Sequence, residues 1–220
     1  GSNGVTPGSA DRLLVSTSAA SLTLGGIVAL SDQTGPHVPW RAGTWQLIDW
    51  TGIGAATKTG DFTYQMPTTS LASGYSFVTT DFLTTGTVSI EKTAANHTWT
   101  GGTNASWAEP TNWEAGTVPT GSTDVFFAAG SNLSHNIDGD KTVRNLFFSG
   151  DANHVINTGT GGVLYSNGGY LEVLGGSQRF ATAQLRIANG SVGTYRIINE
   201  GTLRFDQTIL YHRTSGSGNL

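Results

Sequence analysis

The sequence has no cysteine, only 6 prolines, little charge and no long apolar run. Without cysteine there is no disulfide, no thiolate metal site and no cysteine nucleophile. A helix that spans a bilayer needs a run of roughly 18 apolar residues, so we expect no membrane insertion. Charged residues make up 12% of the chain, and its 11 Lys and Arg are scattered singly. Since nucleic acids are bound by clustered cations, no nucleic-acid partner is expected.

Glycine is abundant, with 31 of the 220 residues, about twice its ordinary share of roughly 7%. Thr, Ser and Asn are also frequent, and these residues favour tight turns because they bond to their own backbone or reach positive φ cheaply. The hydrophobic fraction of 37% is enough to build a core. This composition predicts a folded chain of short strands joined by turns.

Short apolar runs recur along the whole chain, and Gly-rich or Asn-rich breaks separate nearly all of them in its second half. Their spacing of about 8–12 residues is typical of an all-β domain. No apolar pattern with the helical period of 3.6 survives the breaks, so no helix of useful length is expected. The runs lie at 13–15, 22–24, 27–30, 43–52, 62–64, 75–78, 88–90, 125–127, 143–148, 155–156, 163–165, 171–174, 185–187, 195–198 and 203–205.

Two architectures share this spacing. A β-sandwich is built from antiparallel hairpins with polar outward faces. A β-solenoid stacks coils of roughly 20–30 residues, each with two or three short strands. From Leu146 to Phe205 about three strands recur per coil, which favours the solenoid. We therefore predict an all-β fold of right-handed parallel β-solenoid coils, with room for a small antiparallel portion where two units meet.

Two sequence strings are distinctive. The first has tryptophans at Trp99, Trp107 and Trp113 and continues through Val118-Pro119 to Asp124-Val125-Phe126-Phe127. The second is GTWQLIDWTG at 43–52. With these strings the chain resembles the autotransporter-associated β-strand repeat proteins, which are very large exported bacterial surface proteins. The resemblance implies a passenger-like solenoid at the bacterial cell surface or outside the cell, and it supplies no catalytic residues.

The same resemblance implies that the chain spans a junction between two repeat units. The first string looks like the opening of a unit and the second like the strand that closes one. On this interpretation residues 1–9 are a tag or linker, residues 10–97 finish one solenoid unit, and residues 98–220 begin the next.

Trp99, Trp107 and Trp113 are the candidate ligand-binding residues, and two interpretations stay open for them. Flat indole faces suit the C–H faces of sugar rings, so the cluster could be a glycan platform. Large aromatics also seal the first coil of a solenoid, whose open end would expose core and unpaired strand edges. The same two alternatives apply to Trp40, Trp45 and Trp50.

No metal or cofactor is expected. Asp138-Gly139-Asp140 starts like a calcium loop, but Lys141, Thr142 and Val143 follow where further oxygen ligands are needed, so a plain turn is the better interpretation. The five histidines show no metal-ligand spacing. They are His37, His97, His135, His154 and His212.

No catalytic residue is predicted. A β-helix that cleaves polysaccharide needs paired carboxylates on neighbouring coils, and their register cannot be read from one sequence. The candidates in the second half are Asp124, Asp138, Asp140, Asp151, Glu172, Glu200 and Asp206. A set of arginines recurs at coil-like spacing, which fits either a basic ladder for an acidic glycan or charges that keep a sheet face soluble. They are Arg179, Arg186, Arg196 and Arg204.

The sequence therefore favours a non-enzymatic function: a structural or adhesive β-solenoid segment of a giant surface or secreted protein, acting as stalk or display scaffold. The expected partners are cell-surface or extracellular glycans or proteins, with self-association through open solenoid ends. The alternatives are a glycan-binding module that uses the tryptophan clusters and a polysaccharide-active β-helix.

Overall fold

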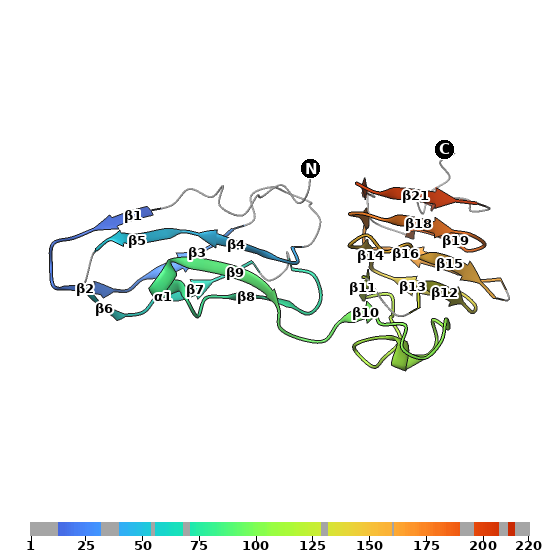
Figure 1. Cartoon of the computed structure of the whole chain (residues 1–220), viewed down its shortest axis with the longest axis horizontal. Coiled ribbons are helices and arrows are strands. Elements are labelled where there is room, and N and C mark those ends of the chain that lie inside the picture. Colours follow the sequence, from blue (N-terminus) through green and yellow to red (C-terminus); the bar gives the residue numbers. More distant parts are fainter. Residues whose placement is uncertain are drawn as a thin grey trace. The chain divides into compact units, whose positions relative to one another are not determined.

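The computed structural model describes residues 13–31, 40–53, 56–67, 71–128, 132–159, 161–189, 196–206 and 211–213, with backbone alone for 187–189, 196 and 211–213. The chain divides into two compact units, residues 1–94 (unit 1) and 95–220 (unit 2). Both are almost entirely β (Figure 1). Within the described residues the only helices are a four-residue α-helix and a three-residue 3₁₀ turn. Neither is long and apolar enough to cross a membrane.

Unit 1 contains two stacked coils of three short strands. The strand Ser21–Leu24 alternates between polar and apolar residues, as half-buried strands do. Each strand of the first coil pairs in parallel with its counterpart in the second: β1 with β5, β2 with β6 and β3 with β7. The first coil is β1 (Leu13–Ser16), β2 (Ser21–Leu24) and β3 (Ile27–Ala29), and the second is β5 (Ile48–Gly52), β6 (Thr57–Gly60) and β7 (Thr63–Gln65).

A helix and an antiparallel sheet complete unit 1. The helix and two strands of the sheet follow the second coil, whereas the strand Gly43–Gln46 lies between the two coils in the sequence. Helix α1 (Phe82–Thr85) inserts the fully buried Phe82 edge-on against Phe62 and Tyr64, with ring centroids 5.7 and 5.6 Å apart. The indole of Trp50 donates to the Phe82 carbonyl at 3.0 Å. The sheet has the order β4 (Gly43–Gln46), β9 (Thr87–Lys92), β8 (Tyr75–Val78), all antiparallel. The expectation of a small antiparallel portion is confirmed.

The turn after α1 depends on one glycine. Gly86 has φ +74°, and a Cβ built there would lie 1.8 Å from the carbonyl oxygen of Ile48. Both the strain and the clash oppose any larger residue, so we expect Gly86→Ala to lower the free energy of unfolding by about 2 kcal/mol or more. Gly26→Ala is the matched control, since Gly26 has φ +99° but nothing within 4 Å. It should cost only about 1 kcal/mol, from the left-handed backbone alone. Equal losses in urea unfolding would contradict the role of the close contact.

Unit 2 is a parallel β-solenoid with three strands in each coil. Every strand pair between neighbouring coils is parallel, which confirms the predicted solenoid and rules out a sandwich. The first sheet consists of β10 (His97–Trp99), β11 (Asp124–Phe127), β14 (Asn145–Phe148), β17 (Tyr170–Val173) and β20 (Arg196–Asn199). The second sheet consists of β12 (Ser134–Ile137), β15 (Val155–Thr158), β18 (Ser177–Phe180) and β21 (Thr202–Phe205). The third sheet consists of β13 (Lys141–Val143), β16 (Val163–Ser166), β19 (Gln184–Asn189) and β22 (Tyr211–Arg213).

The core of unit 2 consists of ladders of like residues on successive coils. Val125, Leu146 and Leu171 stand in register on the first sheet, and all three are fully buried. Two positions further along each strand, Phe127 stacks on Phe148 with centroids 4.5 Å apart and planes 12° from parallel. Alternate residues of a strand point to opposite faces, so these positions line the interior. Each coil therefore buries its apolar residues only when another coil lies on it.

Candidate functional site

The candidate site residues Trp99, Trp107 and Trp113 come together at the start of unit 2. All three are buried, with at most 2% of their surface exposed. Trp113 is central: its ring meets Trp99 at 5.0 Å and Trp107 at 4.8 Å, both edge to face. Edge-to-face packing is the favoured arrangement of aromatic pairs, because a positive ring edge meets a negative ring face. The cluster also packs on Phe127 of the first coil.

Two of the three indole N–H groups are satisfied by backbone carbonyls. Trp99 Nε1 donates to Asn132 at 2.7 Å, and Trp113 Nε1 donates to Trp107 at 2.9 Å. The Nε1 of Trp107 is buried and has no hydrogen-bond partner within the described residues. A buried donor without an acceptor costs about 1–3 kcal/mol, so Trp107 contributes to stability through packing alone.

The segment that carries these tryptophans also covers strand edges of the first coil. Trp99 of β10 and Trp113 form an antiparallel bridge, and Ser106 forms a parallel bridge to Asn136 of β12. On either side of Ser106, the Asn136 N–H donates to the Ala105 carbonyl and the Trp107 N–H donates to the Asn136 carbonyl. Residues 97–113 thus supply hydrogen-bond partners to edges that would otherwise face solvent.

Asn112 holds this segment in shape. Its side chain is fully buried and makes four hydrogen bonds: Oδ1 accepts from the N–H groups of Thr103 and Asn104, and Nδ2 donates to Asn104 Oδ1 and the Ser106 carbonyl. The Asn-Trp dipeptide was visible in the sequence, but nothing there indicated that the asparagine organises the loop.

Burial of this extent favours the interpretation of the cluster as a cap. A sugar that stacked on these indoles would need an open ring face, and the neighbouring rings, Phe127 and the 97–113 segment cover all three. The other tryptophans differ. Trp50 is buried, whereas Trp40 and Trp45 are half-buried beside each other, with centroids 6.2 Å apart and planes inclined by 42°.

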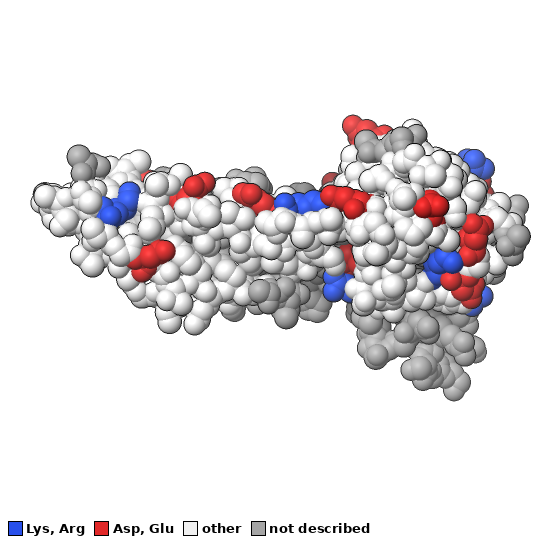
Figure 2. All heavy atoms as spheres, turned by 90° about the horizontal axis from the view of Figure 1, so that it is seen from below, with Lys and Arg blue, Asp and Glu red and all other residues white. Residues whose placement is uncertain are grey.

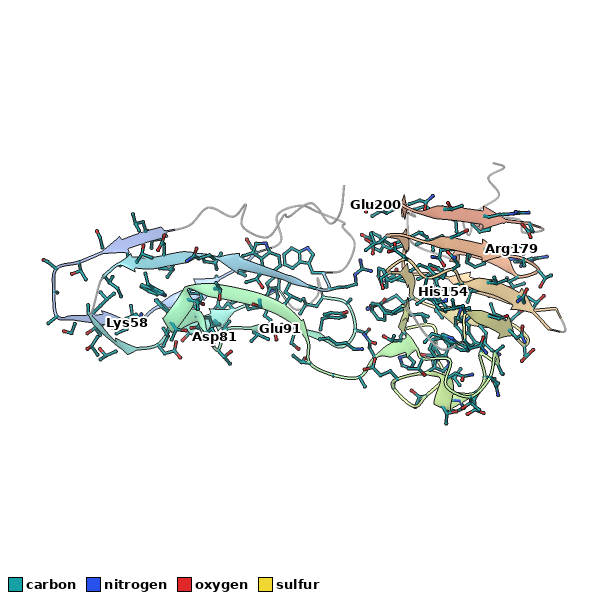
Figure 3. All side chains as sticks on the ribbon, viewed as in Figure 1. Lys58, Asp81, Glu91, His154, Arg179 and Glu200 are labelled. Atoms are coloured by element: carbon teal, nitrogen blue, oxygen red, sulfur yellow. The ribbon has the colours of Figure 1, made fainter. Side chains whose placement is uncertain are left out.

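A histidine pair lies next to the cap, and sequence analysis missed it. His135 Nε2 and His154 Nδ1 are 2.8 Å apart on neighbouring coils, and both residues are fully buried. His135 also packs against the rings of Trp99 and Phe127, at 4.5 and 4.8 Å. Figure 3 shows His154 within the stack of coils. Burial lowers the pKa of His154 to about 4, and burial together with His154 lowers the pKa of His135 well below 6.5. Both rings are therefore neutral at neutral pH.

Three carboxylates of unit 2 lie at strand ends and coil corners, whereas Glu172 is fully buried within β17. Asp124 is fully buried and accepts from Arg144 and from Asn145 Nδ2, so both residues of the next coil hold it. Asp140 accepts from the Val163 N–H at 3.0 Å. Asp138 lies with Asp140 in the connection between β12 and β13 and accepts from Ser106 Oγ. Within the described part of the chain, no three His, Asp or Glu residues gather as a metal site would need.

The four recurring arginines do not form one ladder. Arg179 and Arg204 stand in register on the second sheet and both pair with Asp206, so only these two are neighbours. Arg186 is on the third sheet, 5.6 Å above the ring of Tyr165. Arg196 is on the first sheet, and its side chain lies outside the described residues. The four arginines lie on the successive strands β18 to β21, so their regular spacing is the spacing of strands, and only Arg179 and Arg204 are one full coil apart.

Comparison of the chain with protein-family models, with curated proteins and with solved structures finds no match. The geometry of the two units is therefore the basis for any functional conclusion.

Proposed function

We propose that this chain is a structural segment of a large extracellular or bacterial surface protein, in which stacked β-coils act as a stalk or display scaffold. The observation that carries the proposal is the burial of the tryptophan cluster. Its three indoles are the largest side chains of unit 2, they cover the end of a coil stack, and they are among the most deeply buried residues of the chain.

The rest of unit 2 supports the same proposal. Its core ladders repeat from coil to coil, and its polar side chains mostly bond to neighbouring coils. The corner network of Asp124, Arg144 and Asn145 is one case, because Asn145 Oδ1 also accepts from the Tyr170 N–H of the coil that follows. Such contacts join consecutive coils and give the stack rigidity. In a repetitive protein this construction suits spacing and multivalent display, where many weak contacts add up to avidity.

A glycan-binding function is the second candidate. Its more suitable site is the half-buried pair Trp40 and Trp45, because the tryptophans of the cap are fully covered. Trp45 lies back over Gly43, where an added Cβ would come within 2.5 Å of the indole. Trp40 is also in edge contact with Phe77, at 6.1 Å. A sugar ring can stack only on an indole that keeps part of its surface exposed. Trp40 and Trp45 meet this condition, and the three buried tryptophans do not.

A binding survey separates the two functions. The purified chain is tested against a panel of polysaccharides and matrix proteins, beside the variant Trp45→Ala. A scaffold predicts no selective ligand for either protein. Selective binding that Trp45→Ala weakens by about tenfold or more, roughly 1.4 kcal/mol, with an unchanged circular dichroism spectrum, would replace the scaffold by a glycan-binding module. Selective binding that the variant retains would also overturn the scaffold and place the site elsewhere.

A further inference from the structure

The histidine pair of unit 2 lies directly under the cap segment, residues 97–113. His135 belongs to β12, one of the strands to which this segment is hydrogen-bonded, and its neighbour Asn136 both donates and accepts a backbone bond there. The His135 ring is also in edge contact with the indole of Trp99, with centroids 4.5 Å apart. His154 lies one coil further from the cap, on β15, which pairs with β12. The pair is therefore part of the surface that the cap segment covers.

The pair has no suitable place for an added proton. Nε2 of His135 and Nδ1 of His154 are 2.8 Å apart, so in the neutral pair one of them donates and the other accepts. If both rings are protonated, both facing nitrogens carry hydrogen and this hydrogen bond is lost. The second nitrogen of His135 is buried without a hydrogen-bond partner in the described part of the chain. Since a buried unpaired charge is costly, a protonated ring is stable only where water can reach it.

The direct surroundings of the two rings offer no carboxylate. Gln178 of β18 accepts from the backbone N–H of His154 at 3.1 Å. Burial lowers the pKa of both rings, and a contact with the Ala128 backbone offsets only part of this effect at His154. The rings in contact with the pair are those of Trp99, Phe127 and Phe148.

Charged residues on the surrounding strands point away from the pair. Asp124 of β11 and Glu172 of β17 stand next to the interior residues Val125 and Leu171, so alternation along each strand places them on the outer face. Arg179 of β18 is exposed, and β14 and β15 carry no charged residue. Figure 2 shows acidic and basic residues at the surface of unit 2. Within the described residues, a positive charge on the pair thus has no counter-charge beside it in the core.

Titratable groups on and beside the cap segment keep contact with solvent. Glu109 accepts from Thr111, and these bonds lower its pKa below 4.5, so it loses its charge only in stronger acid. The bond from Ser106 Oγ to Asp138 is long, at 3.4 Å, and therefore weak. The half-buried or exposed groups of this kind are His97, Glu109, Glu114 and Asp138.

The cap segment is joined to the first coil more loosely than the coils are joined to one another. Neighbouring coils such as the first and second pair through strands on all three sheets. The cap segment pairs through β10 on the first sheet and through the single bridge of Ser106 to Asn136 on the second. Its outer side is exposed to solvent at Thr103, Asn104 and Thr111. Lifting this segment therefore breaks fewer backbone bonds than parting two coils, and it brings water to the pair.

We propose that His135 and His154 form an acid-sensitive latch, in which protonation of the pair opens the cap segment before the coils beneath it unfold. Opening hydrates the charged rings and removes the need for the two facing nitrogens to share a hydrogen. It also uncovers the three indoles of the cap, which are at most 2% exposed in the closed form. The end of the stack then presents apolar surface that it hides at neutral pH.

The test is amide hydrogen exchange of the whole chain between pH 7 and pH 4.5, read as protection factors. Each histidine that takes up a proton on opening raises the opening constant by about tenfold per pH unit below 6.5. Protection of residues 97–113 should therefore fall by about tenfold or more per pH unit, and protection of β15 and β18 should fall less steeply. A cap segment that keeps its protection in acid, or that loses it in step with β15 and β18, would overturn the proposal.

Substitutions assign the effect to the pair. His135→Gln and His154→Gln keep a polar side chain that cannot take up a proton in this range, so each should flatten the dependence of cap protection on pH. The readout is a slope, which remains measurable if a variant lowers protection at neutral pH. His97→Gln is the matched control, because His97 belongs to the cap segment but lies outside the pair. A steep slope that both pair variants retain, or one that His97→Gln abolishes, would contradict the latch. The proposed scaffold function does not depend on any of these outcomes.

Discussion

Replacing Trp113 by Ala is expected to destabilise unit 2 by about 3–5 kcal/mol, the range for removal of a large buried aromatic. Trp113 is 2% exposed, contacts Trp99 and Trp107, and donates to the Trp107 carbonyl. Its removal leaves a cavity at the point where the cap meets the first coil. Most domains have a total stability of only about 5–15 kcal/mol, so this loss is a large share. Denaturant unfolding followed by circular dichroism measures it.

Two controls make the result specific to the cap. Trp113→Phe keeps most of the packing but loses the indole hydrogen bond, so it should cost clearly less than the alanine variant. Trp45→Ala removes a half-buried indole from unit 1 and should leave the unfolding of unit 2 as it is. A Trp113→Ala protein with wild-type stability would show that the cluster is not a structural cap.

Acidification is expected to weaken unit 2 between pH 6.5 and about 4. The pKa of His154 is lowered from 6.5 to about 4 because the ring is buried, and the pKa of His135 is lowered as well. In this range the unfolded chain binds protons that the folded protein cannot accept, so the free energy of unfolding falls as the pH falls. Below about 4 the contribution of His154 is exhausted. For His154 alone the full loss is about 3 kcal/mol.

The histidine contribution can be separated from that of Asp206 by its pH range. Arg179 and Arg204 lower the pKa of Asp206 below 3.8, so the stability from this carboxylate is lost only at more acidic pH. Chemical denaturation at a series of pH values measures the slope between pH 4 and 6.5. The double variant His135→Phe, His154→Leu should flatten that slope, whatever its absolute stability. A slope that the double variant preserves would contradict the assignment to the histidine pair.

The architecture was predictable from sequence because it rests on local patterns. Runs such as Val163–Tyr165 between Gly-rich breaks specify short strands with one buried face, and the recurrence of three such runs indicates a coil. The antiparallel sheet of unit 1 was expected only in general terms, as a small portion where two units meet. The four-residue helix α1 was not expected, since a single turn leaves no periodic signal.

The contacts between coils were not predictable, because they depend on register. His135 and His154 are 19 residues apart, and only the lengths of the intervening turns bring their rings together. The same holds for Asp124 with Arg144. By contrast, the tryptophan cluster is close in sequence and could be singled out directly. Its burial could not, since exposed and buried tryptophans look alike in a single sequence.

The corners of unit 2 differ in length, and this difference limits where the chain can change. A single residue, Arg144, connects β13 to β14, while residues 149–154 connect β14 to β15. Arg144 is anchored on Asp124, so an insertion there would shift every later strand out of register. The 149–154 corner contains the exposed residues Gly150, Asp151 and Asn153, and insertions at such exposed positions are tolerated far better. Over evolution, new surface features should therefore accumulate at the long corners while the ladders inside stay the same.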